Sequence, residues 1–252
     1  MTRVRSCSTD APSPLLDARG LTRLFDTSVG VRGLDVAVAT GEVHALVGLN
    51  GAGKTTLMRL LLGMLHPDSG TVRLQGRDIK GINAATWASV GHLVDQPFAY
   101  PELDVRSNLT VAARLRGVPK ARVANTVERV IAELELERYA RTRARVLSRG
   151  NLQRVGLGCA LQHDPGLIIL DEPTTALDPK GVILLRESLL RRAAAGAAIL
   201  VSSHHLDEVA RIASRITVIN RGRIVGTLDP RGVDIERAFF ALVEHDELDH
   251  AQ

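Results

Sequence analysis

The sequence predicts an α/β protein in which a mostly parallel sheet is interrupted by an inserted block of helices. Short, continuously apolar segments alternate with helical ones before residue 95 and again after residue 165. This pattern is typical of parallel sheets that are buried on both faces. Residues 106–158 contain almost no strand pattern, and we expect helices there, broken at 117–119 and 147–150, where glycine or proline interrupts the periodicity.

The individual elements follow from local patterns of apolar and turn-forming residues. A helix is expected after Gly53, with Leu57 and Leu61 on its apolar face and its end near 66–67. A last amphipathic helix is expected at 234–243. Strands are expected at 15–24, 31–38, 42–47, 71–74, 90–94, 167–170, 198–202, 216–220 and 223–227.

Composition limits both the domain organisation and the class of protein. The polar, proline-containing residues 1–14 predict a disordered tail, followed by one main domain at 15–233 and a C-terminal helix and tail at 234–252. Only 3% of the residues are aromatic, which argues against a nucleic-acid binder that stacks bases on aromatic rings. Neither a membrane-spanning run nor a secretory signal is recognisable, and two cysteines fit a reducing compartment. We therefore expect a cytoplasmic protein.

Basic residues are concentrated in one stretch of the chain. Residues 138–154 contain six arginines and no acid, although the formal net charge of the whole chain is only +4. Such a stretch can be a solvated helix face or a surface that faces phosphate groups. The sequence leaves both interpretations open.

The most specific motif is a phosphate-binding loop of the pattern G-x-x-x-x-G-K-[ST], placed between an apolar strand and a helix. Its glycines allow backbone N–H groups to point at phosphate oxygens, and the following helix adds its positive end. Lys54 can reach the β- and γ-phosphates, and the Thr55 hydroxyl can bind Mg²⁺. The residues expected to bind the nucleotide are Gly48, Leu49, Asn50, Gly51, Ala52, Gly53, Lys54, Thr55 and Thr56.

A second motif is the apolar run 167–170, which ends in Asp171 and Glu172. An acidic end alone is a weak signal, because buried parallel strands often end in acids. Beside a phosphate loop, however, Asp171 can hold Mg²⁺ through its water shell, and Glu172 can orient or deprotonate the attacking water.

Further segments, in the same order, resemble the ATP-binding cassette ATPases of ABC transporters over roughly residues 15–227. Residues 147–154 resemble the signature motif, 173–178 the D-loop and 201–204 the switch-histidine segment. Phe25 occupies the place where that family has an aromatic residue under the adenine ring. The resemblance implies a RecA-like P-loop NTPase core with an N-terminal antiparallel β subdomain and a helical subdomain at about 95–160.

The resemblance also implies how the site works. Two cassettes, expected to form a homodimer, enclose each ATP, with Ser148 and Gly150 of one subunit contacting the γ-phosphate held by the other. His204 is the expected γ-phosphate contact and acts in catalysis with Lys54 and Glu172, while neighbouring His205 is the competing candidate. Arginine at 149 and asparagine at 151 depart from the family's signature.

The Q-loop is a second departure from the family pattern. An ungapped reading places Asp95 at the family's glutamine position, whereas a shift of one residue restores Gln96. We favour Asp95, and both residues are candidate ligands for Mg²⁺ or the attacking water.

The predicted function is ATP hydrolysis that drives a separately encoded membrane permease, with the chain bound peripherally to the inner face of the cell membrane. The segments around the Q-loop and signature resemble exporters of the ABC-2 group, which implies export of a drug, peptide or antibiotic. Residues 97–115 are expected to contact the permease, and no nucleic-acid partner is expected. The alternative is a soluble ABC-type ATPase that acts in translation or DNA repair.

Overall fold

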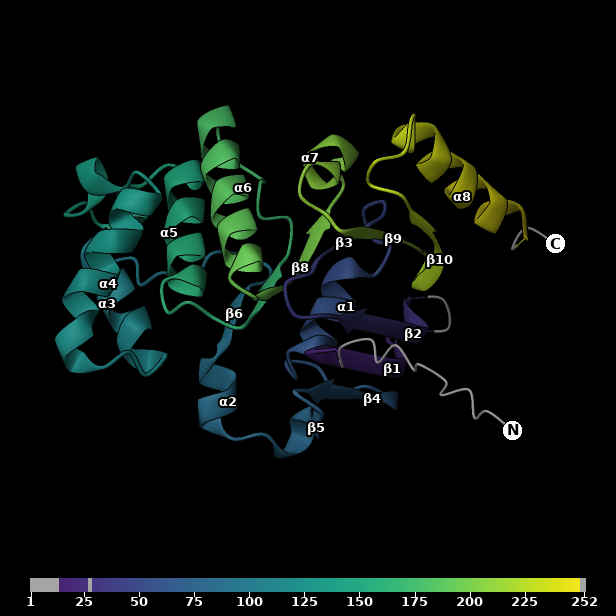
Figure 1. The fold of residues 1–252 in the computed structure, drawn as a ribbon, viewed down its shortest axis with the longest axis horizontal. Helices are drawn as coiled ribbons and strands as arrows, with labels where there is room; N and C mark the ends of the chain where they lie inside the picture. Colours follow the sequence, from purple (N-terminus) through teal and green to yellow (C-terminus); the bar gives the residue numbers. More distant parts are fainter. Residues whose placement is uncertain (1–13, 27–28, 250–252) are drawn as a thin grey trace, which may run out of the picture.

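The computed structural model describes residues 14–26 and 29–249, whose strands form two sheets (Figure 1). The first is antiparallel, with the order β2-β1-β4-β5. The second has the order β10-β9-β3-β8-β7-β6. The outer strand β10 is antiparallel to β9, and the other pairings are parallel. This arrangement confirms the predicted α/β class with an antiparallel subdomain at the N-terminal side.

The bounds of the elements are as follows. The strands are β1 (Leu16–Leu24), β2 (Gly30–Val38), β3 (Val43–Val47), β4 (Ser69–Leu74), β5 (Arg77–Asp78), β6 (Val90–Leu93), β7 (Leu167–Leu170), β8 (Ala198–Ser203), β9 (Arg215–Asn220) and β10 (Arg223–Leu228). The α-helices are α1 (Lys54–Leu61), α2 (Ala84–Ala88), α3 (Val105–Leu115), α4 (Lys120–Glu133), α5 (Arg149–Leu161), α6 (Pro179–Ala194), α7 (Leu206–Ala210) and α8 (Ile235–Asp249). Short 3-10 turns occupy Ile79–Gly81, Glu137–Tyr139 and Ala144–Val146.

The six-stranded sheet separates two apolar cores. In β7, Ile168 and Leu170 face the core that also contains residues of helices α3 to α8. Leu167 and Ile169 face the other core, which is closed by α1 and the antiparallel sheet. Successive side chains of a strand point to opposite faces, so a continuously apolar strand fits a sheet that is covered on both sides.

The helical block α3–α5 packs beside the sheet and shares one core with it (Figure 1). Val155 and Leu157 of α5 belong to the same cluster as Ile168 and Leu170 of β7. Because this core is continuous, the limits of the helical subdomain, about 95–160, remain a prediction.

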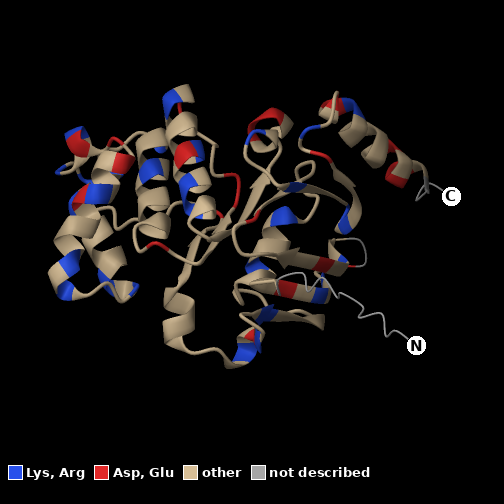
Figure 2. Ribbon diagram, in the orientation of Figure 1, with Lys and Arg blue, Asp and Glu red and all other residues tan. Residues whose placement is uncertain are grey.

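Charged residues of both signs lie on α4 and α6 (Figure 2). Ion pairs join the two helices. The Glu133 carboxylate accepts hydrogen bonds from Arg192 and Ser188, at 2.6 and 2.7 Å, and Lys180 pairs with Glu135 at 2.6 Å. Burial by itself raises the pKa of Glu133, but the hydrogen bonds from Arg192 and Ser188 lower it overall. These contacts fix α4, and with it the helical block, onto α6.

Two helices end at other residues than the sequence predicts. Helix α1 ends at Leu61, five residues before the expected end, because the chain turns at Gly63 with a φ of +66°. Helix α8 runs to Asp249, beyond the expected end at 243. The predicted disordered tail, 1–14, lies outside the described residues except for Pro14. No helix in the described part is both long and apolar enough to cross a bilayer.

Candidate functional site

The phosphate-binding loop joins the buried strand β3 to α1. Gly53, the residue before α1, has a φ of +103°, and a Cβ atom there would lie 2.9 Å from Val31 Cγ1. Only glycine fits this conformation and this space without strain. The loop therefore ends at the N-terminus of α1, where unpaired N–H groups favour anions.

Lys54 is buried beneath this loop, and its ammonium group contacts two carbonyl oxygens and a carboxylate. Its Nζ atom donates hydrogen bonds to the carbonyl oxygens of Gly48 and Leu49, at 2.7 and 3.3 Å. The same atom lies 3.4 Å from Glu172 Oε1. A buried ammonium group is tolerated only with such partners, and these contacts hold the cation where the loop meets the end of β7.

Asp171 lies at the centre of a buried oxygen cluster. The Thr55 hydroxyl donates to Asp171 Oδ2 at 2.5 Å, and the Ser202 hydroxyl donates to Asp171 Oδ1 at 2.5 Å. Ser202 also accepts a hydrogen bond of 2.9 Å from the backbone N–H of Glu172. The cluster joins α1, β7 and β8, and its carboxylate and hydroxyl oxygens are the donor types that Mg²⁺ prefers.

Glu172 and His204 form a pair at the edge of this cluster. Glu172 Oε2 lies 2.7 Å from His204 Nδ1, and it accepts a longer bond of 3.3 Å from the His204 backbone N–H. Glu172 Oε1 is buried and has no hydrogen-bond donor among the described residues. The Glu172 backbone has a φ of +45°, a costly conformation for a non-glycine residue that is found most often at functional sites.

Of the two adjacent histidines, the structure brings His204 to Glu172. The His205 ring lies beside it, tilted by 42° with ring centroids 4.0 Å apart, and the His205 backbone N–H donates to Ser203 Oγ at 2.9 Å. Only His204 is therefore paired with Glu172, and its expected contact with the γ-phosphate stays a prediction.

The two Q-loop candidates lie apart from the oxygen cluster. Both Asp95 and Gln96 are exposed, and in the described chain neither is hydrogen-bonded to Thr55 or Asp171. The Asp95 carboxylate instead forms an ion pair with both Arg59 Nε and Arg59 Nη2. The expected contact of Asp95 with the metal site is therefore absent from this conformation, because Arg59, one helical turn after Thr55, neutralises the carboxylate.

Two further sets of predicted nucleotide contacts make no hydrogen bond to the phosphate loop among the described residues. Phe25 follows β1, is 54% exposed and has the Arg23 guanidinium 5.5 Å from its ring centroid. Ser148 caps α5 by accepting a bond of 3.3 Å from Asn151 N. At Gly150 a Cβ atom would lie 2.7 Å from the Ala176 carbonyl oxygen. Within this one chain, Ser148 and Gly150 thus adjoin the segment after β7 and make no hydrogen bond to the phosphate loop.

The structure adds residues whose roles we did not predict. Ser202 links Asp171 and Glu172, and it lies within the segment recognised for its histidine. The buried Arg154 donates to Asp178 Oδ1 at 2.5 Å, and Gln153 donates to the Pro173 carbonyl at 3.0 Å. These two hydrogen bonds hold α5 against the segment that follows Glu172. Both belong to the signature-like motif, but the motif alone did not reveal their partners.

The fold and the site together define a P-loop nucleotide-binding protein. The family model described as ABC transporter matches residues 31–175, which is more than half of the chain. The chain belongs to this family and is an ATP-binding, ABC-type ATPase.

Relatives agree on the family and differ in what they transport. A Nod factor export ATP-binding protein I from Burkholderia lata is 35% identical over 88% of this chain and 73% of its own length. A ribose import ATP-binding protein RbsA 1 from Burkholderia pseudomallei is 36% identical over 90% of this chain, which spans only 27% of that protein. Because one name states export and the other import, the predicted exporter subtype stays a prediction. Both names describe transport, so the alternative in translation or DNA repair is not favoured.

A solved structure has the same fold. The structure titled as the ATP binding subunit of an ABC transporter matches with a TM-score of 0.83 and 29% identity, over 90% of this chain and 99% of that one.

Proposed function

We propose that this chain hydrolyses MgATP between two copies of itself and thereby drives a separately encoded membrane permease. The observation that carries the proposal is the cluster of Lys54, Thr55, Asp171, Glu172 and His204 around one phosphate loop. The cluster joins a phosphate-binding cation, oxygen ligands and a candidate base, which phosphoryl transfer to water requires.

In the proposed reaction each side chain has a separate task. Lys54 and the loop N–H groups bind the β- and γ-phosphates. Glu172 accepts the proton of the attacking water through Oε1, which accepts no hydrogen bond among the described residues and lies 3.4 Å from Lys54 Nζ. His204 holds the Glu172 carboxylate through Oε2 and contacts the γ-phosphate from the same position.

The residues present also fit Mg²⁺. This ion keeps several waters and takes only one or two protein oxygens besides phosphate oxygens. Thr55 Oγ1 and Asp171 would hold it, and the bound ion would neutralise phosphate charge. A cluster of three or more metal-binding side chains is not needed for such a site, and none occurs among the described residues.

The second copy would supply Ser148 and Gly150. Both lie at the start of α5, where backbone N–H groups can donate to an anion. Neither makes a hydrogen bond to the phosphate loop within the described chain. A site completed by a second copy accounts for this separation. The arginines of 138–154 would add favourable potential for the nucleotide.

We further propose that the chain lies peripherally on the inner face of the cell membrane and supports export, as the ABC-2 group does, of a drug, peptide or antibiotic. Support comes from the relative named for export, of which this chain spans 73%. The permease would bind at residues 97–115, where Phe98 and Tyr100 are exposed.

The variant Glu172→Gln tests the site and the dimer together. The amide has nearly the same shape as the carboxylate but cannot accept the proton, so we expect turnover to fall by about 10²–10⁴-fold. ATP should still bind, and an ATP-bound dimer should accumulate in size-exclusion chromatography. Glu187→Gln, at an exposed position of α6, is the matched control. A monomeric Glu172→Gln variant with normal turnover would contradict the proposal.

A further inference from the structure

The side chain of Arg23, near the end of β1, covers one face of the Phe25 ring. Its guanidinium carbon lies 5.5 Å from the ring centroid, within the distance at which a cation is attracted to the electron-rich face of an aromatic ring. Phe25 nevertheless remains 54% exposed. The ring therefore has a cation over one face and exposed surface that a further flat group can cover.

Asp68 fixes the position of Arg23. Asp68 Oδ1 accepts a hydrogen bond of 2.7 Å from Arg23 Nη1, and Asp68 Oδ2 accepts one of 2.9 Å from the backbone N–H of Leu24. The backbone N–H of Asp68 in turn donates to the Thr22 carbonyl oxygen at 2.8 Å. One residue thus holds the guanidinium and also the backbone on both sides of Arg23, through hydrogen bonds of which one joins two charged groups.

The end of β1 is also fixed relative to the phosphate loop. Arg23 lies opposite Val31 of β2 in the antiparallel pairing. A Cβ atom at Gly53 of the loop would lie only 2.9 Å from Val31 Cγ1, so β2 packs directly on the loop. Gly222 joins the two a second time, because it accepts a backbone hydrogen bond of 2.8 Å from β2 and donates one of 2.9 Å to Ala52. The backbone of β1 and β2 therefore sets the place of the aromatic ring relative to bound phosphate.

We propose that Arg23 and Asp68 are positioning residues for the nucleotide: they hold the Phe25 ring so that the adenine base stacks on the face that Arg23 leaves free. The inference rests on the proposed function, in which MgATP binds at the phosphate loop. It goes beyond the predicted contact of Phe25, because it assigns a role to two residues that act through the ring. Stacking on an aromatic side chain stabilises a bound base, and a ring that is already held loses less entropy when the base binds.

Such a role predicts an effect on the base and none on the phosphates. The phosphate loop and Lys54 bind the triphosphate whether or not a base is attached. Loosening the ring should therefore raise the Kd for MgATP and leave unchanged the Kd for magnesium tripolyphosphate, which has no base. A general loss of structure in the loop would instead raise both values.

Isothermal titration calorimetry of the full chain with these two ligands tests the inference. We expect Phe25→Ala to raise the Kd for MgATP about tenfold and Arg23→Gln to raise it about threefold, with no change for tripolyphosphate. Arg23→Lys should restore most of the affinity, because lysine keeps the cation. Arg19→Gln is the matched control, since Arg19 lies on the same strand and also pairs with an acid, Asp17, at 2.8 Å.

Asp68→Asn tests the anchor of the guanidinium. The amide oxygen can still accept the hydrogen bond from Leu24, but the ion pair with Arg23 is lost, so we expect the Kd for MgATP to rise about twofold. This variant carries the same test if Arg23→Gln does not fold, and thermal unfolding verifies the fold of each variant.

A double-mutant cycle shows whether the two residues act through the ring. In the Phe25→Ala background, neither Arg23→Gln nor Asp68→Asn should weaken MgATP binding further. A loss that persists in this background, a loss of tripolyphosphate affinity, or an unchanged Kd for MgATP in the single variants would overturn the inference and leave the proposed function standing. A wild-type chain that binds no MgATP would instead contradict the proposed function.

Discussion

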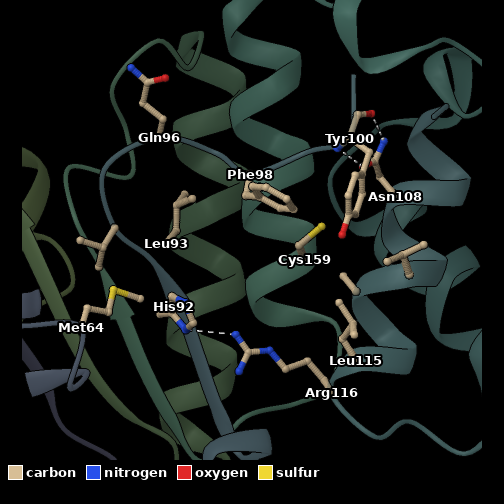
Figure 3. Close-up of a pocket in the computed structure, with 14 residues that line it drawn as sticks. Met64, His92, Leu93, Gln96, Phe98, Tyr100, Asn108, Leu115, Arg116 and Cys159 are labelled. Carbon is tan, nitrogen blue, oxygen red and sulfur yellow. Dashed lines mark hydrogen bonds between the residues drawn. The ribbon is translucent and has the colours of Figure 1, made fainter. Parts of the chain in front are cut away.

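A second pocket, of about 350 Å³, lies between β6, α3 and α5 and is lined by Arg116; we call it the Arg116 pocket (Figure 3). The nucleotide site and the Arg116 pocket both lie beside the six-stranded sheet, yet they differ in how their charged groups are paired. In the nucleotide site, Lys54 lies beside Glu172, and Asp171 accepts hydrogen bonds from Thr55 and Ser202. In the Arg116 pocket, the guanidinium has only neutral partners.

The difference shows which charged groups find their partners within a single chain. Buried charges need partners, and the nucleotide site supplies most of its own. The Arg116 pocket has exposed apolar side chains at its rim, and its cation forms no ion pair with a carboxylate of the described residues.

The first prediction concerns stability at acid pH. Burial is the main cause that lowers the pKa of His44, His92 and His163 to about 4, from 6.5. The unfolded chain therefore takes up protons as the pH falls through 6.5, while the folded chain takes them up only near pH 4. The free energy of unfolding should fall across this window, by up to about 3 kcal/mol for each histidine, and should change little with these groups below pH 4.

Urea titrations between pH 7.5 and 4 test this prediction. In His92→Gln the slope of unfolding free energy against pH should be smaller than in the wild type by up to about 1.4 kcal/mol per pH unit. The exposed His66→Gln is the matched control. An unchanged slope in His92→Gln would mean that burial and the charge of Arg116 do not lower the pKa of His92.

The second prediction concerns nucleotide affinity. Lys54→Ala removes the cation but keeps the N–H groups of the loop, so we expect the Kd for MgATP to rise about a hundredfold. Isothermal titration calorimetry measures it, with Lys120→Ala at the exposed start of α4 as the control. If affinity were unchanged, the phosphate loop would not be the nucleotide site.

The third and smallest prediction concerns the Q-loop. Asp95→Ala should lower Mg²⁺-dependent turnover by about tenfold, because a side chain that orients the metal or the water contributes less than the base itself. Gln96→Ala should have a smaller effect. The reverse ranking in an ATPase assay would show that Gln96 has the role. Loss of the exposed Asp95–Arg59 pair itself should cost no more than about 1 kcal/mol of stability.

The sequence was a good guide where a function depends on neighbours along the chain. Gly53, Lys54 and Thr55 belong to one loop between a strand and a helix, and Asp171 and Glu172 end the next apolar strand, so their convergence could be predicted. The hydrogen bond from Ser202 to Asp171 was not predicted, because a serine within a strand has no distinctive sequence pattern. The partner of Asp95 was also missed, since Arg59 is 36 residues away and meets it only in the folded chain.

The sequence by itself therefore determined the α/β class, the phosphate loop and the acids at the end of β7, because spacing along one strand, loop or helix fixes them. Only the tertiary structure decided that His204 rather than His205 meets Glu172, that Asp95 pairs with Arg59 and that Arg116 has no carboxylate. The physical reason is that the partner of a charged group is whichever group the packing of the elements brings near it. Those groups come from several elements, whose distances in space no local pattern encodes.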